Sequence, residues 1–227
     1  MNRGYFITGT DTGIGKTWIT AGLLRAGAQR GWRTVGLKPV ASGCARVEGQ
    51  LRNEDALLLM EHASEPLAYE QVNPCALELP VSPHLAAEAQ GRAIDIGRLA
   101  AHCHAVGARA DVCLVEGVGG WLVPLGPDHT VADLALALNL PVILVVGIRL
   151  GCLNHALLSQ RAIRASGAAM AGWVANVVDP ENRLTNEVIA TLTERLDAPC
   201  LGTVPCMDTM DTGRIAGHLD IDTLWNG

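Results

Sequence analysis

The sequence contains no run of about 18 consecutive apolar residues, so we expect no segment of it to span a membrane. Its first seven residues carry one positive charge and too few apolar residues for a secretory signal peptide. The formal net charge of −6 argues against nucleic acid as the main partner, although a nucleotide needs only a local positive site. The seven cysteines include no Cys-x-x-Cys pair, as is typical of reduced thiols. We therefore expect a soluble, cytoplasmic protein.

The composition indicates a single folded unit. Apolar residues make up 49% of the 227 and charged residues 18%, so burial of apolar side chains can offset the entropy lost on ordering the chain. This length suits one well-packed domain and is short for two. No repeat, low-complexity tract or linker interrupts the sequence, and we predict one domain over residues 1–227.

Short apolar runs alternate with helical patterns along the whole chain. Most runs are nearly continuous in Val, Ile, Leu and Ala, which is typical of parallel strands covered on both faces. The predicted strands are Gly4–Thr8, Thr34–Lys38, Asp111–Glu116, Pro141–Gly147, Gly172–Val177 and Cys200–Val204. The predicted helices are Lys16–Arg30, Asn53–His62, Pro83–Gln90, Asp95–Gly107, Thr130–Leu138, Leu153–Gly167, Asn182–Leu196 and Thr212–Leu219. The irregular segment Glu61–Pro83 is predicted as surface loops. The alternation predicts an α/β fold, a mostly parallel sheet with helices on both faces.

The first predicted strand leads into a glycine-rich loop, Gly9-Thr10-Asp11-Thr12-Gly13-Ile14-Gly15-Lys16-Thr17, and then into a helix. In a phosphate-binding loop the backbone N–H groups and the helix dipole hold an anion, the lysine reaches the outer phosphates and the hydroxyl ligates magnesium. The standard spacing would place the first glycine at position 10, so this loop is one residue longer. An ordinary glycine turn is the weaker interpretation in this strand–helix context. We predict a P-loop NTPase-like domain in which Lys16 binds phosphate and Thr17 binds magnesium.

Lys38 closes the second predicted strand and is followed by Pro39-Val40-Ala41-Ser42-Gly43. In an NTPase sheet this lysine would point at the transferring phosphate, where a cation stabilises developing negative charge. At the end of an apolar strand it could equally extend to solvent. Pro39 and Gly43 would fix the loop and leave Ser42 free to donate a hydrogen bond. Spacing alone leaves both interpretations of Lys38 open.

Two carboxylates are candidate magnesium ligands. Glu116 closes the third predicted strand, and the glycines after it suggest close backbone approach by a ligand, although an acidic turn residue would look similar. Asp55 lies at a predicted helix start, where an acidic residue is an ordinary partner of the helix dipole. From its position alone, Asp55 is therefore more simply explained as a helix-start acid.

Two later strands also end in candidate binding residues. The run Gly147–His155 opens a helix, whose N-terminus could hold a carboxylate or a phosphate or could be a plain strand-to-helix turn. Asn176 ends the fifth predicted strand, and its amide can both donate and accept, as reading an adenine edge requires. A turn-forming asparagine would give the same pattern.

Taken together, these motifs resemble those of the dethiobiotin synthetases, the ATP-dependent carboxylases that close the ureido ring in biotin synthesis. The similarity covers almost the whole chain, in order and spacing: the loop Gly9–Thr17 with its extra residue, Lys38–Gly43, Leu51–Asp55, Val115–Trp121, Leu150–His155, Ala171–Asn176 and Leu201–Pro205. The resemblance implies a homodimer that takes 7,8-diaminononanoate, carbon dioxide or bicarbonate, and ATP with Mg²⁺. It further implies that one amine becomes a carbamate, that the carbamate attacks the γ-phosphate to give a carbamic–phosphoric anhydride, and that the second amine closes the ring.

The resemblance also implies roles for individual residues. Lys38 would hold the carbamate and the γ-phosphate, Lys16 would neutralise phosphate charge, and Thr12 would line the reacting end of the loop. Thr17, Asp55 and Glu116 would hold magnesium. The implied nucleotide-binding residues are Gly13, Ile14, Gly15, Lys16, Thr17, Trp18, Asp55, Glu116, Gly117, Val118, Gly119, Asn176, Val177, Pro205, Cys206 and Met207. The implied substrate-binding residues are Ser42 and, across the dimer interface, Gly151, Cys152 and Asn154.

This chain departs from the family pattern at Gly13, where the family often has an acidic residue that could orient magnesium, water or the substrate amine. Arg149, where lysine is common, keeps its charge. Two rival functions fit the sequence less well. A related amide-forming synthetase of the cobyrinate amidase type usually carries a glutaminase domain with a nucleophilic cysteine, for which 227 residues leave no room. A partition-type ATPase would have a lysine near Asp11 and a basic surface or amphipathic helix, and the sequence shows neither.

Overall fold

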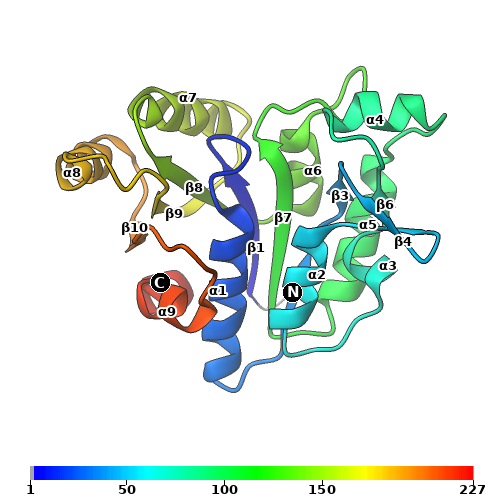
Figure 1. The fold of residues 1–227 in the computed structure, drawn as a ribbon, viewed down its shortest axis with the longest axis horizontal. Helices are drawn as coiled ribbons and strands as arrows, with labels where there is room; N and C mark the ends of the chain where they lie inside the picture. The colour runs from blue at the N-terminus through cyan, green and yellow to red at the C-terminus, as the bar shows by residue number, and fades with distance from the viewer. Residues whose placement is uncertain (1–2, 227) are drawn as a thin grey trace.

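Six parallel strands form the central sheet in the order β10-β9-β8-β1-β7-β2 (Figure 1). The computed structural model describes residues 3–226, so residues 1, 2 and 227, the ends of the predicted domain, lie outside the described residues. The strands are β1 (Arg3–Gly9), β2 (Thr34–Leu37), β7 (Val112–Gly120), β8 (Val142–Ile148), β9 (Met170–Val177) and β10 (Cys200–Val204). In an open parallel sheet, ligands bind beyond the carboxyl ends of the strands where the strand order reverses. Here that point is the end of β1, between β7 and β8.

Helices cover both faces of the sheet, and each face has its own apolar core. Alternate residues of β1 point to opposite faces, so Tyr5 and Ile7 join one core and Phe6 joins the other. The first face carries α1 (Lys16–Gln29), α2 (Glu54–His62), α9 (Thr212–Gly217) and α10 (Ile221–Asn226) (Figure 1). The second face carries α5 (Ile96–Gly107), α6 (Val131–Leu138), α7 (Cys152–Ala165) and α8 (Thr185–Arg195).

Short elements lie beyond the β2 edge of the sheet (Figure 1). They are the helices α3 (Tyr69–Val72) and α4 (Pro83–Ala89), the parallel pair β3 (Val40–Ala41) and β6 (Cys75–Ala76), and the antiparallel pair β4 (Ala45–Val47) and β5 (Gln50–Arg52). The chain therefore leaves the main sheet after Leu37 and makes a small layer of its own before it returns in β7. This layer forms one wall of the cavity described below.

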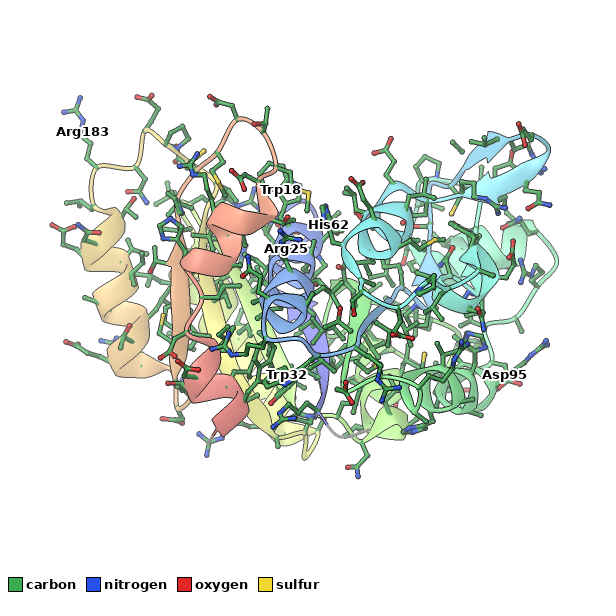
Figure 2. The ribbon with its side chains drawn as sticks, turned by 90° about the horizontal axis from the view of Figure 1, so that it is seen from below. Trp18, Arg25, Trp32, His62, Asp95 and Arg183 are labelled. Carbon is green, nitrogen blue, oxygen red and sulfur yellow. The ribbon has the colours of Figure 1, made fainter. Side chains whose placement is uncertain are left out.

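The C-terminal helix is tied to the opposite end of α1 from the phosphate loop. Trp32 lies just beyond α1 (Figure 2). Its ring packs edge-on against that of Trp225 in α10 with centroids 4.9 Å apart, and the Arg3 guanidinium lies 4.5 Å from the Trp32 ring centroid. The Tyr5 hydroxyl donates to the Leu224 carbonyl over 2.7 Å. These contacts close the first face of the sheet and leave the carboxyl ends of the strands open.

The predicted α/β fold is confirmed: all six predicted strands and all eight predicted helices are present, with ends that shift by a few residues. The prediction of loops over Glu61–Pro83 is wrong in part, because α3 and β6 form there and Val72, Cys75 and Leu77 are buried. The sequence also gave no sign of α10 or of the short strands β3, β4 and β5.

The start of α6 provides a test of local stability. The Thr130 backbone N–H and hydroxyl both donate to Asp133 Oδ2, over 2.6 and 2.8 Å. These bonds, the backbone one first, hold the pKa of Asp133 below its usual range. A carboxyl whose pKa is lower in the folded state stabilises the fold above its unfolded pKa, about 3.9, and loses that contribution as the pH falls.

We expect Asp133→Ala to lower the free energy of unfolding by about 1 kcal/mol at pH 7, and by less at pH 3. Urea unfolding at the two pH values measures both numbers. Asp128→Ala is the matched control, because Asp128 is exposed and has no hydrogen bond or ion pair among the described residues. An equal loss at both pH values would contradict the assignment of the stabilisation to the ionised carboxylate.

Candidate active site

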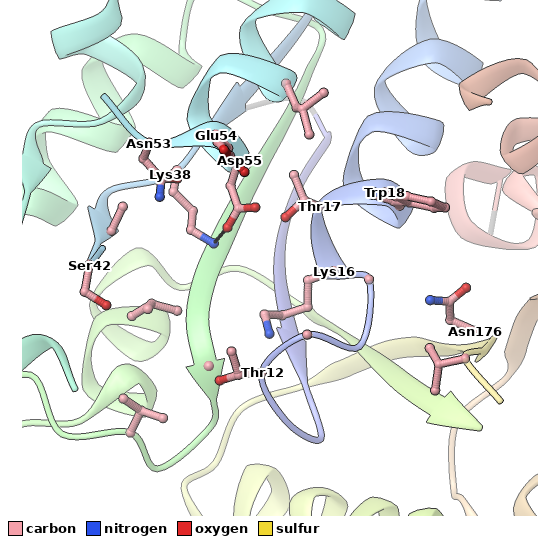
Figure 3. Close-up of a pocket in the computed structure, with 18 of the residues that line it drawn as sticks. Thr12, Lys16, Thr17, Trp18, Lys38, Ser42, Asn53, Glu54, Asp55 and Asn176 are labelled. Atoms are coloured by element: carbon pink, nitrogen blue, oxygen red, sulfur yellow. Dashed lines mark ion pairs between the residues drawn. The ribbon is translucent and has the colours of Figure 1, made fainter. Parts of the chain in front are cut away.

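A cavity of about 1020 Å³ opens at the carboxyl ends of β1, β2 and β7. The phosphate loop and the first turn of α1 form its floor, the small layer beyond β2 forms one wall, and the segments after β9 and β10 form the other. In Figure 3, Ser42, Lys38 and Asp55 lie on one side of the phosphate loop, and Trp18 and Asn176 lie on the other. The cavity is thus long enough to have two chemically different ends, joined by the loop.

The phosphate loop is built on two glycines with left-handed backbone. Gly13 has φ +72° and Gly15 has φ +84°, a conformation that side chains disfavour. Gly15 is the N-cap of α1, so the N–H groups of the first helical turn face the cavity without a side-chain cap. Ile14 between them is buried, and its carbonyl accepts a 2.8 Å hydrogen bond from Asn176 Nδ2. The loop is therefore fixed to the end of β9.

The register of three strands brings Lys38 to Glu116. Leu37 of β2 pairs with Val115 of β7, and Glu116 pairs with Ile7 of β1, so the residue after Leu37 lies level with Glu116. Lys38 Nζ donates to Glu116 Oε1 over 2.6 Å and forms an ion pair with Asp55 Oδ2 over 2.8 Å (Figure 3). The Lys38 side chain is only 4% exposed. The interpretation that Lys38 extends to solvent is wrong.

The charges of these groups are strongly coupled. Burial opposes the charged form of Lys38, but attraction to Glu116 and Asp55 outweighs it, and the pKa of Lys38 lies above its ordinary value. Burial also opposes ionisation of Asp55, but the Lys38 ammonium outweighs it and lowers the pKa of Asp55. Lys16 forms no ion pair among the described residues, and burial, reinforced by repulsion from Lys38, lowers its pKa to about 8. An anion bound beside Lys16 would stabilise its charged form and offset both effects.

Thr17, Asp55 and Glu116 fit a magnesium ion. Thr17 Oγ1 donates to Glu116 Oε1 over 2.9 Å, whereas Glu116 Oε2 is buried and has no hydrogen-bond partner among the described residues. A buried carboxylate oxygen without a partner is costly, which is expected of a site that a ligand completes. Magnesium beside phosphates uses one or two carboxylates with a hydroxyl and water, and this donor set has that composition. Residues 3–226 contain no cluster of three His, Cys, Asp or Glu residues suited to a metal.

Most predicted site residues line the cavity. They are Thr12, Gly13, Gly15, Lys16, Thr17, Trp18, Lys38, Ser42, Asp55, Val118, Gly119, Asn176, Val177, Pro205, Cys206 and Met207. Ile14 and Glu116 lie directly behind the lining, as the hydrogen bonds above show. The remaining predicted residues, Gly117, Gly151, Cys152 and Asn154, do not line it. The start of α7 is thus separate from the cavity of its own chain.

Two details of the β7 prediction need correction. Glu116 does not end its strand, because β7 continues to Gly120. The glycines after it are also explained by the protein itself: a Cβ on Gly117 would lie 3.1 Å from the Phe6 ring, and one on Gly120 would lie 3.3 Å from the Gly9 carbonyl oxygen. Close packing against β1, rather than a ligand, therefore accounts for these two glycines.

Comparison with known proteins agrees with the site. A family model described as an AAA domain matches residues 3–213. The ATP-dependent dethiobiotin synthetase of Cellvibrio japonicus is 51% identical over 222 residues, with 98% of this chain and 97% of that protein covered. The synthetase of the same name from Pseudomonas paraeruginosa is 54% identical, with 98% of each chain covered, and that of Yersinia pestis is 46% identical, with 99% and 96% covered. The chain belongs to the ATP-dependent dethiobiotin synthetase family. It is therefore a ligase of the ATP-binding, biotin-biosynthesis class.

More distant structures share the fold of this synthetase family. The septum site-determining protein MinD from Pyrococcus horikoshii, complexed with Mg-ADP, superimposes with a TM-score of 0.58 at 18% identity, over 98% of this chain and 89% of that one. A ParA family ATPase from Chlorobium tepidum gives 0.57 at 12% identity, over 100% and 96%. These similarities confirm the P-loop NTPase fold. No helix within residues 3–226 is both long and apolar enough to cross a membrane.

The cavity of this family member includes residues that the sequence did not point to. They are Ala41, Asn53, Glu54, Leu58, Pro80, Val81, Ser82, Pro83, Val123 and Val178. Ala41, Glu54 and Val178 each lie beside a predicted residue, and Asn53 belongs to the Leu51–Asp55 motif, so these four follow from a neighbouring motif. The run Pro80–Pro83 does not, because the only signal there was proline, which equally indicates a surface loop.

Proposed function

We propose that this chain, as one synthetase domain, catalyses the ATP-dependent carboxylation and ring closure of 7,8-diaminononanoate with carbon dioxide to give dethiobiotin, ADP and phosphate. The names of its relatives support the overall reaction. The observation that carries the proposal is Lys38, a buried cation held between Asp55 and Glu116 in the cavity that also contains the phosphate loop. A cytoplasmic location belongs to the same proposal.

One end of the cavity suits the adenine of ATP, and the other suits the γ-phosphate and the diamine (Figure 3). Asn176, with Pro205, Cys206 and Met207, would flank adenine. Because Asn176 Nδ2 is already bonded to Ile14, its Oδ1 remains available to accept from an exocyclic amino group. The phosphates would then lie over the loop and Lys16, and the γ-phosphate would reach Lys38, where Ser42 would bind the diamine.

The chemistry proceeds in three steps. One amine of the substrate adds to carbon dioxide, loses a proton and becomes a carbamate. A carbamate oxygen attacks the γ-phosphorus, the bond to the β-phosphate oxygen breaks, and ADP leaves behind a carbamic–phosphoric anhydride. The second amine attacks the carbonyl carbon and loses a proton, phosphate leaves, and the ureido ring is closed. Lys38 and Lys16 would stabilise the charge on the transferring phosphoryl group, and Thr12 would line the same end of the loop.

Magnesium, when bound, neutralises phosphate charge in reactions of this class. Thr17, Asp55 and Glu116 would hold it, since Thr17 bonds to Glu116, Asp55 and Glu116 contact the same Lys38 ammonium, and Glu116 Oε2 has no hydrogen-bond partner within residues 3–226. Gly13 carries no side chain, so position 13 supplies no carboxylate to orient magnesium, water or the substrate amine.

A homodimer forms part of the proposal. The start of α7 is exposed at Leu150, which is 99% exposed, and Gly151 has φ +94° and caps the helix. Gly151, Cys152 and Asn154 do not line the cavity of their own chain. We infer that their helix N-terminus binds the substrate carboxylate in the cavity of a partner subunit.

Phosphate release tests the function. We expect MgATP to release phosphate only when 7,8-diaminononanoate and bicarbonate are both present, with one dethiobiotin formed per phosphate, measured by a coupled phosphate assay and mass spectrometry. Omission of each substrate in turn is the control. An equal rate of phosphate release without the diamine would contradict the proposal. It would favour a partition-type ATPase switch, an alternative that the shared fold allows.

A further inference from the structure

A line of hydrogen bonds joins the start of α2 to the backbone of Lys38. The Asn53 N–H donates to the Tyr69 hydroxyl over 2.7 Å, and the hydroxyl donates to Asn73 Oδ1 over 3.0 Å. Asn73 Nδ2 then donates to the Lys38 carbonyl over 2.5 Å. Tyr69 and Asn73 are both buried, and neither lines the cavity. These two residues belong to α3 and the residue after it, in the segment where the sequence indicated only loops.

The peptide groups of Lys38 depend on this segment. Lys38 lies between the end of β2 at Leu37 and the start of β3 at Val40, outside both strands. Its N–H donates to the Val72 carbonyl over 2.9 Å, and its carbonyl accepts the bond from Asn73. Both backbone hydrogen-bonding groups of Lys38 are thus satisfied by Val72 and Asn73, and no bond of the six-stranded sheet holds them.

The other end of the line holds Asp55. Asn53 is the N-cap of α2, and its Oδ1 accepts from the Ala56 N–H over 3.2 Å. Asp55 lies in the first turn of this helix and forms the 2.8 Å ion pair with Lys38 Nζ. The hydrogen bonds therefore make a closed path, from the Lys38 backbone through Asn73, Tyr69 and α2 to Asp55 and back to the Lys38 side chain.

We propose that Tyr69 and Asn73 are positioning residues for phosphoryl transfer, which set the place of Lys38 relative to Asp55 without touching any substrate. The proposal rests on the role of Lys38 in the proposed function. A displacement of about 1 Å in a reacting group can cost about a hundredfold in rate. A purely structural role would instead lower the free energy of unfolding and leave kcat per folded molecule unchanged.

Tyr69→Phe tests the proposal because it removes only the hydroxyl of Tyr69. We expect kcat to fall about tenfold, because the hydroxyl no longer holds Asn73 and Asn53, and the Kd for MgADP to change less than about twofold. Tyr5→Phe is the matched control: it removes a buried hydroxyl that donates to the Leu224 carbonyl, far from the cavity, and should cost stability without changing kcat. Asn73→Asp, which replaces the donor to Lys38 by a carboxylate oxygen, should reduce kcat more than Tyr69→Phe.

Two further measurements separate positioning from stability and from the function itself. The double variant Tyr69→Phe/Asn73→Asp should lose no more than the worse single variant, because both changes break one path. Hydrogen exchange of the Lys38 amide should be faster in Tyr69→Phe than in wild type and unchanged in Tyr5→Phe, a result that needs no turnover. If Tyr69→Phe has the same kcat and the same Lys38 amide exchange rate as wild type, the proposal is overturned, whereas the proposed function is unaffected. If wild type shows no diamine-dependent turnover, the function fails and the exchange data alone decide whether Tyr69 holds Lys38.

Discussion

Lys38→Ala is expected to reduce turnover by about 10²–10³-fold while the Kd for MgADP changes by no more than a few-fold. Lys38 is the cation nearest to Asp55 and Glu116, whereas the loop and Lys16 form the rest of the phosphate site. Removal of its charge therefore destabilises the transferring phosphoryl group in the transition state, whereas binding of the α- and β-phosphates is largely retained. Steady-state phosphate release and fluorescence titration with MgADP measure the two quantities on the same preparation.

The same substitution leaves Glu116 buried without a cation, and removal of one partner of a buried ion pair typically costs about 3–5 kcal/mol of stability. Denaturant unfolding must therefore accompany the assay, so that turnover is expressed per folded molecule. Arg46→Ala is the matched control, because it removes a cation paired with Glu78 over 2.8 Å at an exposed site outside the cavity. Unchanged turnover in Lys38→Ala would remove Lys38 from the mechanism.

The strands and helices could be predicted because their patterns are local. A strand covered on both faces, such as β8, is continuously apolar over its whole length, which is typical of a buried parallel strand. Of the small layer beyond β2, only α4 could be predicted in this way. Its other elements are two to four residues long, too short for any period, and they are held by distant partners, as the bond from the Lys38 N–H to the Val72 carbonyl shows.

The candidate site could be predicted residue by residue, but not as an arrangement. Gly9–Thr17 is a continuous motif, and its position between β1 and α1 fixes its role. The ion pair between Lys38 and Glu116 depends on the register of β2 against β7, which no local pattern contains. The true end of β7 was missed because its last residues are mostly glycine, which strands usually avoid and which this strand needs in order to pack against β1. The hydrogen-bonded path through Tyr69 and Asn73 could not be predicted either, because α3 is too short for a periodic pattern and its partners are distant in sequence.

Gly15→Ala is expected to weaken nucleotide binding by about 10²-fold. A Cβ on Gly15 would lie 2.2 Å from Asn176 Nδ2, and the residue has φ +84°, so the substitution combines a clash with an unfavourable backbone. Asn176 would have to move, and its bond to the Ile14 carbonyl, which fixes the loop to β9, would be lost. Because Gly15 is also the N-cap of α1, the N–H groups that face the phosphates would be displaced with it. Titration with MgADP gives the change in Kd.

Gly13→Ala is the control that separates the two effects of Gly15→Ala. Gly13 also has left-handed backbone, at φ +72°, but a Cβ there meets no atom within 4 Å, so only the backbone cost of about 1–2 kcal/mol remains and the loss of affinity should stay near tenfold. The double variant Gly15→Ala/Asn176→Ala removes the clash and should bind MgADP more tightly than Gly15→Ala alone. Equal losses in Gly13→Ala and Gly15→Ala would show that backbone conformation, and not the contact with Asn176, makes glycine necessary at position 15. A Cβ at position 13 has open space around it, so only the left-handed backbone opposes Gly13→Glu, and lack of room does not explain why this position is not acidic.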